Sequence, residues 1–421
     1  MRSGRMTDAA IKVTELRFED EVLARLDLPS GELRVTRGIG SGLATGLDGR
    51  IWSVGDRGPN LKVKLAVKRY GLGHLAEHGV SDGAKVMPCL EVGPALSELR
   101  VEGDRVEIVC TVPLRDADGR ALSGLPVPGG PNNRSEPAIG LDGAVIAPNP
   151  SGADSEGVAL LGDGGFWVGD EYGPSLLRVG ADGSVMVRWV PAGCEPLFAD
   201  ARYPVVGALP AIAARRRLNR GFEAIALSPD ERWLHLAFQS PLSHPDDEAH
   251  ERARRVRLWR LDAQTGAVAA EWLYPLDAPD SFRRDAEAGK VERSDVKVSE
   301  IVAVGADRLL VLERVSLTTK LYLIVLDEAA ALDPAYMEEA TRPTVEELSA
   351  DGTAGLPVLT KRLVLSSDDL PGLGADLEGV AMLSPRSLLI VNDNDFGIEG
   401  VATRFWRVDL SRDLADYPSA G

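Results

Sequence analysis

One sequence pattern recurs along most of this chain of 421 residues. In each copy, a small or acidic corner leads into an apolar strand, a tight polar turn follows, and a second apolar strand ends in acidic or amide residues. A pattern that repeats regularly along the chain indicates a fold built from one repeated sheet unit. The copies begin at Ser41, Asp154, Gly221, Ser299 and Asp376. Four of them carry a corner glutamate, and these glutamates recur at intervals of 67, 77 and 78 residues: Glu156, Glu223, Glu300 and Glu378.

Further strand-like segments lie between the copies and are joined by short turns that contain Gly and Asp. Residues 175–179 with 185–189 are one such pair. Two antiparallel hairpins per repeat make a four-stranded antiparallel sheet, which is one blade of a β-propeller. The strands are apolar almost throughout, as expected where neighbouring blades cover both faces. We therefore predict an all-β chain, a β-propeller of four-stranded antiparallel blades with five detectable repeats and room for a sixth between residues 60 and 154.

The repeats span nearly the whole chain, so we predict one propeller domain over residues 1–421. The last repeat shows a single strand after its first hairpin, and residues 11–18 are suited to supply the missing outer strand and close the ring. Residues 61–90, 279–297 and 328–355 fall outside the repeat and are expected to be insertions or surface excursions. Residues 61–78 are the best helical segment among them.

The repeated corners place polar side chains at both ends of each hairpin. Antiparallel pairing brings the first and last residues of a hairpin to the same edge of the sheet. If the first strand of each blade lies nearest the propeller axis, carboxylates from several blades meet at the mouth of the central channel. The predicted ligands of a shared cation are Glu156, Glu223, Glu300, Glu378, Asp56 and Asp393. The alternative for each corner carboxylate is to accept backbone N–H groups and fix its own turn.

The residue types indicate a hard cation. Converging carboxylates either bind a cation or take up protons, because like charges in one site repel. Calcium accepts about six to eight carboxylate, amide and carbonyl oxygens, so it is the expected metal. The three cysteines have no zinc spacing, and the five histidines lie outside the repeated corners, which disfavours zinc.

The net charge of the chain disfavours nucleic acids and anionic membranes as partners. The formal net charge of −17 opposes binding to nucleic-acid phosphates and to anionic membranes, and no basic stripe with interleaved aromatics is present. The expected partner is a small molecule, and the pattern gives no oligomeric state. The N-terminal residues have no apolar signal-peptide core, and no stretch approaches about 18 apolar residues. The sequence as numbered predicts a cytoplasmic protein.

Three stretches resemble a known family, the phytase-like proteins, which are also described as having esterase-like activity. These stretches are residues 154–174, residues 312–314, and residues 376–381 followed by 392–397. The resemblance implies a β-propeller, calcium-dependent phosphoester hydrolysis and, in many members, export. Arg57 and Arg314 end their hairpins at the acidic edge and are suited to grip a phosphate. The candidate catalytic residues are Glu156, Asp170, Arg57 and Arg314. The missing signal peptide and the 61–90 insertion depart from the family's pattern.

Two other functions fit the same pattern. Lactonase-like propellers, such as gluconolactonases, also use an entry glutamate and channel Asn or Asp residues on one divalent cation. A propeller without activity that binds a ligand at its mouth is the third reading. The chain has no G-x-S-x-G motif, which disfavours a serine esterase.

Overall fold

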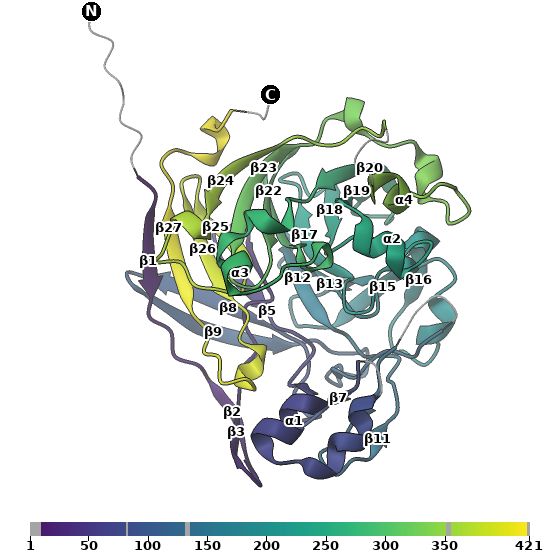
Figure 1. Ribbon diagram of the computed structural model, residues 1–421, viewed down its shortest axis with the longest axis vertical. Helices are drawn as coiled ribbons and strands as arrows, with labels where there is room; N and C mark the ends of the chain where they lie inside the picture. The colour runs from purple at the N-terminus through teal and green to yellow at the C-terminus, as the bar shows by residue number, and fades with distance from the viewer. Residues whose placement is uncertain (1–9, 81–82, 131–134, 351–354, 419–421) are drawn as a thin grey trace, which may run out of the picture.

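A computed structural model describes residues 10–80, 83–130, 135–350 and 355–418. Within these residues, five large sheets are arranged around a common centre (Figure 1), and each contains four antiparallel strands. The first sheet contains β4 (Gly42–Thr45), β5 (Ile51–Val54), β8 (Ala95–Glu102) and β9 (Arg105–Pro113). The second contains β12 (Ser155–Leu160), β13 (Phe166–Asp170), β14 (Ser175–Val179), β15 (Val185–Pro191) and a fifth, parallel strand, β16 (Val205–Leu209).

The other three sheets follow the same order. The third contains β17 (Phe222–Leu227), β18 (Trp233–Phe238), β19 (Arg255–Asp262) and β20 (Val268–Pro275). The fourth contains β21 (Lys297–Gly305), β22 (Arg308–Arg314), β23 (Thr319–Val325) and β24 (Lys361–Ser366). The fifth contains β25 (Leu377–Ser384), β26 (Ser387–Asn392), β27 (Phe405–Asp409) and, as its outer strand, β1 (Lys12–Leu16).

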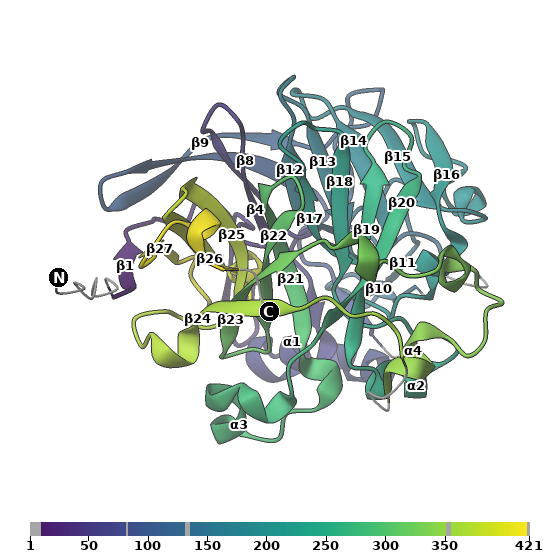
Figure 2. The same cartoon turned by 90° about the horizontal axis from the view of Figure 1, so that it is seen from above.

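The first strands of the five sheets form a closed ring. β4 contacts β12, β12 contacts β17, β17 contacts β21, β21 contacts β25, and β25 contacts β4 again. Figure 2 shows these strands near the middle of the molecule, with β9, β16 and β27 toward the outside. The prediction of a β-propeller with four-stranded antiparallel blades is confirmed, and the strand nearest the axis is the first of each repeat.

The predicted closure of the ring by the N-terminal segment is also confirmed. β1 pairs antiparallel with β27, from Lys12 opposite Asp409 to Leu16 opposite Phe405. The last blade is therefore built from both ends of the described chain. This pairing covers the edge of β27, which would otherwise be open to association with another strand.

The apolar cores lie between neighbouring blades. Between the first and second blades, Trp52 meets Phe166 edge to face with ring centroids 4.8 Å apart. A larger core joins the second, third and fourth blades, with Trp167, Phe222 and Ile301 among its buried members. Each inner strand is thus covered on both faces, which accounts for the nearly continuous apolar runs in the sequence.

Residues 60–154 form no sixth blade in their described part. β6 (Leu61–Lys62), β7 (Lys85–Val86), β10 (Ala138–Ile139) and β11 (Val145–Ile146) make a small sheet that includes a parallel pair. The expected helix is present but short: α1 (Val63–Tyr70) ends at Gly71, whose φ of 73° terminates the helix in the left-handed conformation. With the hairpin of β2 (Val22–Leu28) and β3 (Gly31–Thr36), this segment forms the lower body in Figure 1.

The remaining helices lie in connections outside the ring. α2 (Asp247–Arg252) joins β18 to β19, and α3 (Arg283–Ala288) lies in the predicted excursion 279–297. α4 (Val345–Ala350) lies between β23 and β24, inside the predicted excursion 328–355, of which residues 351–354 are outside the described residues. The end of the 279–297 segment differs from the prediction, because Lys297 is already the first residue of the inner strand β21.

Deleting residues 1–16 tests the closure of the ring. The deletion removes β1 and exposes the edge of β27, so we expect the thermal midpoint to fall by about 5 °C or more and the protein to self-associate. Deleting residues 1–9, which removes no residue of β1, is the control and should leave both properties unchanged. Differential scanning calorimetry and light scattering measure the two effects. Equal stability of the two deletions would show that the β1–β27 pairing contributes little.

Candidate functional site

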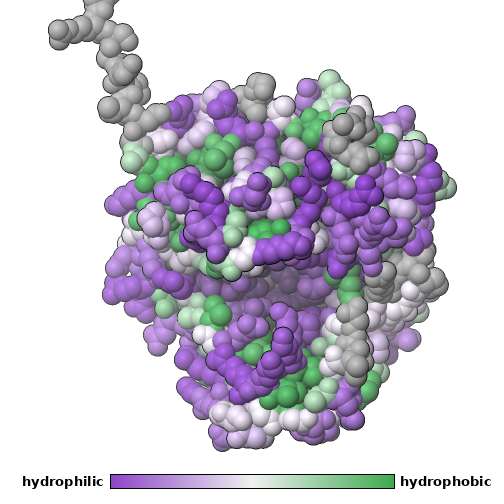
Figure 3. Space-filling model, viewed as in Figure 1, coloured by the Kyte–Doolittle hydropathy of each residue, from purple (hydrophilic) through white to green (hydrophobic). Residues whose placement is uncertain are grey.

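A polar cavity of about 300 Å³ lies at the channel mouth, where the inner strands begin. Every blade contributes a residue at the end of its second strand or within two residues beyond it: Asp56, Glu171, Gln239, Arg314 and Asp393. Lys62 and Lys85 border the cavity from the lower body, and Lys297 and Arg314 border it from the blades. Figure 3 shows the molecule hollowed between these two parts, with hydrophilic residues around the hollow. The predicted convergence of hairpin ends is therefore present.

β-Bulges aim the corner glutamates into this cavity. In β12, the pairing with β13 shifts between Ser155 and Gly157, so Glu156 is the extra residue. In β17 and β25, the corresponding extra residues are Glu223 and Glu378. A bulged residue leaves the regular ladder, and its side chain is redirected. All three glutamates line the cavity.

Glu300 does not line the cavity, which corrects its prediction as a cation ligand. In β21 the bulge falls on Ser299, and Glu300 pairs regularly with Leu312. A shift of one residue along a strand turns the side chain to the opposite face of the sheet. The Glu300 carboxylate accepts hydrogen bonds from the backbone N–H of Leu43 at 3.0 Å and of Ile301 at 3.1 Å. It therefore links β21 to β4. This is the alternative role considered for the corner carboxylates, in which they accept backbone N–H groups.

Asp170, predicted to be catalytic, also lies outside the cavity lining. Its carboxylate forms a fully buried ion pair with Arg188 and accepts the backbone N–H of Gly173 at 2.9 Å. Its neighbour Glu171 lines the cavity instead. Successive residues of a strand point to opposite sides, so only one of two adjacent acids at a hairpin end points into the cavity. The placement of Asp170 favours a structural role.

Two groups of three carboxylates in the cavity have spacing that suits metal ions. Asp56, Asp154 and Glu156 form one group; Glu156, Glu378 and Asp393 form the other. Within each group, one oxygen from each residue lies within 4.8 Å of the others, and Glu156 belongs to both. Asp154 is only 2% exposed, and its Oδ1 has no hydrogen-bond partner among the described residues. A buried carboxylate oxygen without a partner, in an all-oxygen group, fits a calcium ion.

Burial and mutual repulsion change the acidities of these groups. Burial raises the pKa of Glu156 well above its usual range, and the charges of Asp56 and Asp154 add to this. Burial, together with Asp395, raises the pKa of Asp393 to about 7. For Asp154, burial also acts to raise the pKa, but the charge of Arg57, a hydrogen bond with Asp56 and the charge of Lys85 together outweigh it, so the pKa is lowered. Without a cation, Asp393 is therefore partly protonated near neutral pH, and the pKa of Glu156 is shifted in the same direction.

The two predicted arginines line the cavity, and each forms ion pairs with carboxylates. Arg57 Nη1 lies 2.7 Å from Glu136 Oε1, although the two groups are not aligned for a hydrogen bond. Arg314 donates to Asp376 Oδ1 at 2.7 Å and forms an ion pair with Glu378. The buried Nε and Nη1 of Arg57 have no hydrogen-bond partner among the described residues.

The sequence analysis missed several cavity residues, chiefly Asp154, Glu171, Lys62, Lys85 and Lys297. Position gives the signal for two of them, Asp154 and Lys297. Lys297 lies two residues before the bulge of its strand, as Asp154 and Asp376 do in theirs. Burial, together with the charges of Arg314 and Arg220, lowers the pKa of Lys297 to about 7. Lys62 and Lys85 come from the insertion, so no repeat could reveal them.

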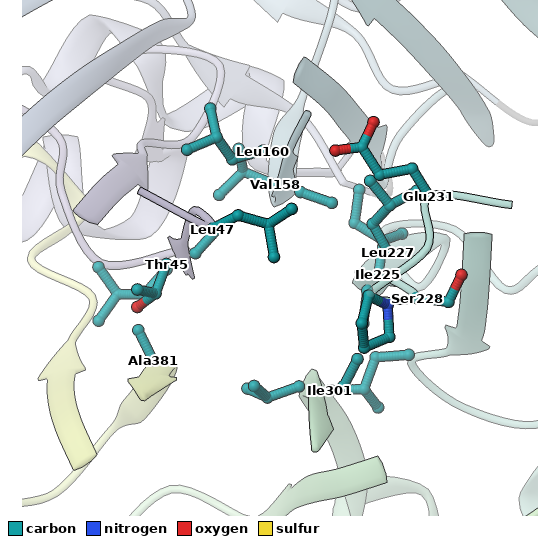
Figure 4. A pocket seen from close by; sticks show the side chains of 17 residues that line it. Thr45, Leu47, Val158, Leu160, Ile225, Leu227, Ser228, Glu231, Ile301 and Ala381 are labelled. Atoms are coloured by element: carbon teal, nitrogen blue, oxygen red, sulfur yellow. The ribbon is translucent and has the colours of Figure 1, made fainter. Parts of the chain in front are cut away.

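The far end of the inner strands is apolar. A pocket of about 130 Å³ is surrounded there by side chains from all five blades, including Thr45, Val158, Ile225, Ile301 and Ala381 (Figure 4). Its one carboxylate, Glu231, accepts the backbone N–H of Gly162 at 2.6 Å. The ionisable groups suited to chemistry thus lie at the other end, the mouth.

The ring of sheets and its acidic mouth define a β-propeller with a candidate cation site where the inner strands begin. Residues 36–396 match the phytase-like family, described as esterase-like activity of phytase, and the chain belongs to this family. A protein of Arthroderma benhamiae named as an uncharacterized secreted protein is 24% identical over 241 residues. That match covers 51% of this chain and 44% of the relative, so the chain spans less than half of that curated protein.

Solved structures with a related shape are distant in sequence. The PQQ-bound aldose sugar dehydrogenase from Streptomyces coelicolor is 13% identical, with 95% of this chain and 98% of that chain covered and a TM-score of 0.35. Selenomethionine-substituted virginiamycin B lyase from Staphylococcus aureus is 13% identical, with 95% and 100% covered and a TM-score of 0.32. These values support no inference about activity. None of the helices in the described ranges has the length and apolar character needed to cross a bilayer.

Replacing Asp170 with Asn tests its structural role. The change leaves Arg188 charged and buried without its carboxylate, so we expect the free energy of unfolding to fall by about 3–5 kcal/mol. Any affinity for calcium, measured by titration calorimetry below the unfolding range, should stay within about twofold, because Asp170 does not line the cavity. Normal stability together with lost metal binding would instead show that Asp170 belongs to the functional site.

Proposed function

We propose that this protein is a hydrolase of phosphoesters that depends on a divalent cation, calcium, held at the channel mouth. The observation that carries the proposal is the pair of carboxylate groups that share the buried Glu156. The residues that would hold the cation are Asp56, Asp154, Glu156, Glu378 and Asp393. The family assignment supports hydrolysis of an ester bond as the coarser class.

The cations in the cavity support a phosphoester over a neutral ester or lactone. Lys62, Lys85 and Lys297 line a cavity of a protein with a net charge of −17. An anionic substrate gains from such groups, because they offset the long-range repulsion by the rest of the protein. A lactone carries no charge that these lysines could neutralise.

The proposed division of labour follows from charge and pKa. A bound calcium supplies positive charge for phosphoryl oxygens and acidifies a water molecule. Arg57 has guanidinium donors free of hydrogen bonds among the described residues and is assigned to orient the phosphate. Arg314 is assigned to hold Glu378 and Asp376 in position through its ion pairs.

Glu171 is the proposed proton donor. Burial, together with the charges of Asp154 and Glu223, raises the pKa of Glu171 to about 8, so its carboxyl group carries a proton at neutral pH. It is suited to give that proton to the leaving alkoxide oxygen, as general acids with a raised pKa do.

Replacing Glu156 with Gln tests the cation site. Because Glu156 belongs to both carboxylate groups, we expect bound calcium to be lost in elemental analysis and kcat/KM for p-nitrophenyl phosphate to fall about 100-fold. EDTA should have the same effect on the unchanged protein, with recovery on adding calcium. Glu300→Gln is the matched control, since it changes a corner glutamate that lies outside the cavity.

The same assays separate the alternatives. Calcium-dependent cleavage of a lactone without cleavage of phosphoesters would favour the lactonase-like reading. Bound calcium without activity on phosphoesters, carboxylic esters or lactones would favour a ligand-binding propeller. Full activity of Glu156→Gln would contradict the proposed site.

The effect of calcium on stability should depend on pH. The raised pKa values of Glu156 and Asp393 mean that the metal-free folded protein holds protons that the unfolded chain releases above about pH 4 to 5. These acids stabilise the metal-free fold at low pH, and that contribution declines as pH rises toward 7. Calcium binds the deprotonated carboxylates, so its stabilising effect grows over the same interval.

Thermal midpoints with EDTA and with calcium at pH 5, 6 and 7 measure this effect. We expect the difference between the two midpoints to increase with pH, and to vanish in Glu156→Gln. The buried histidines titrate alike in both conditions and cancel in the difference. A difference that is constant across this pH range would contradict proton competition at the site.

The cellular location stays a prediction. The N-terminal residues as numbered favoured the cytoplasm, whereas the curated relative from Arthroderma benhamiae is named as a secreted protein. That name supports export of this chain as the alternative. Fractionation of the native source with an antibody would distinguish the two.

A further inference from the structure

The short helix α3 is tied to the loop that follows β22. The carboxylate of Asp285 on this helix is buried and accepts three consecutive backbone N–H groups, at 3.0, 2.8 and 2.7 Å. The donors belong to Ser316, Leu317 and Thr318. They lie in loop 315–318, which joins β22 to β23. Hydrogen bonds to an ionised acceptor are stronger than neutral ones, so one carboxylate fixes the backbone of most of this loop.

The same helix also holds residues 370–376, the loop that leads into β25. Arg284 Nη1 donates to the backbone oxygen of Leu373 at 3.1 Å, and Arg284 Nη2 donates to that of Gly374 at 2.8 Å. Nη2 also donates to the backbone oxygen of Leu317, in the first loop. One guanidinium therefore joins the two loops to each other and to α3.

The two loops meet at the edge of the mouth cavity. The N–H of Asp376 donates to the backbone oxygen of Ser316 at 2.8 Å, and both residues line the cavity. Asp376 has a φ of 54°, a left-handed conformation that is unfavourable for residues with a side chain. Such a conformation persists only where the surrounding contacts impose it. The bond to Ser316, in the loop that Asp285 holds, is one of these contacts.

From Asp376 the contacts continue to a proposed ligand of the cation. Arg314 Nη1 donates to Asp376 Oδ1 at 2.7 Å, and the same guanidinium forms an ion pair with Glu378. Arg314 Nε donates to Ser299 Oγ at 2.8 Å, which holds the other side of the guanidinium. The direction of the Glu378 carboxylate therefore depends on Arg314, and the direction of Arg314 depends in part on Asp376.

We propose that Asp285 is a positioning residue of the cation site. It does not line the cavity. It fixes loop 315–318, which holds the left-handed backbone of Asp376, and it thereby sets where Arg314 places the Glu378 carboxylate. The role of Glu378 as a calcium ligand rests on the proposed function, whereas the coupling of α3 to Asp376 does not. The segment 279–297 outside the repeat is then part of the support of the site.

Two variants and one matched control test this role. Asp285→Asn replaces an accepting oxygen with an NH₂ group, which cannot accept the N–H groups of the loop. Arg284→Ala releases the same loops and leaves Asp285 in place. The control is Asp116→Asn, because Asp116 and Asp285 are both 7% exposed. Asp116 accepts the backbone N–H groups of Asp118 and Arg120, both at 2.9 Å, in a turn that does not line the cavity. Circular dichroism checks that each variant is folded.

Hydrogen exchange in EDTA, followed by mass spectrometry, measures the coupling without metal or activity. We expect peptides that contain Asp376 to exchange about tenfold faster in Asp285→Asn and in Arg284→Ala, because the loop that accepts the Asp376 N–H is released. Asp116→Asn should accelerate exchange only around residues 116–120. Unchanged exchange at Asp376 in the two test variants would overturn the positioning role.

Calcium titration calorimetry measures the effect on the cation site. We expect the Kd for calcium to rise about tenfold in both test variants, as it does when groups that orient metal ligands are removed, and to stay unchanged in Asp116→Asn. Turnover of p-nitrophenyl phosphate at saturating calcium should then match that of the unchanged protein. An unchanged Kd in the folded test variants would overturn the role of Asp285. Absence of calcium binding in every protein would reject the proposed function, and faster exchange at Asp376 would still establish its coupling to α3.

Discussion

The repulsion among carboxylates at the channel mouth is the constraint on which the rest of this site depends. Glu156 and Asp56 lie in a buried cavity where burial and like charges raise their pKa values well above the ordinary range. Such a group of acids persists only with protons, with neighbouring cations or with a bound metal ion. The arginines and lysines of the cavity supply part of the positive charge. The unpartnered oxygen of Asp154 indicates where a metal ion would complete it.

The ring geometry makes this concentration of charge tolerable. Inner strands begin at the mouth and end at the apolar pocket of Figure 4, so the polar and apolar ends of the channel are separated along each strand. Apolar packing between blades, such as Trp52 against Phe166, provides the stability that an acidic mouth weakens. The closure by β1 then seals the last blade against opening.

Sequence reasoning reached the fold through the repeat and reached the cavity through hairpin ends. It erred where a shift of one residue decides direction. Asp170 and Glu171 are adjacent acids, and only the register of β12 with β13 determines which of them enters the cavity. Glu300 follows the same motif as Glu156, but the bulge of β21 falls one residue earlier, so its carboxylate serves the backbone of β4. Neither bulge position has a visible sequence signature.

The chain's sequence alone determined the propeller class, the number of detectable repeats and the chemical type of the mouth, because periodic apolar strands and acidic corners are local properties. Tertiary structure decided which acids meet, since the meeting of Glu156 with Asp56 and Asp393 requires three separate blades to close on one axis. It also decided that the inserted segment brings Lys62 and Lys85 to that mouth. Such contacts depend on packing between distant parts of the chain, which the local sequence around each residue does not specify.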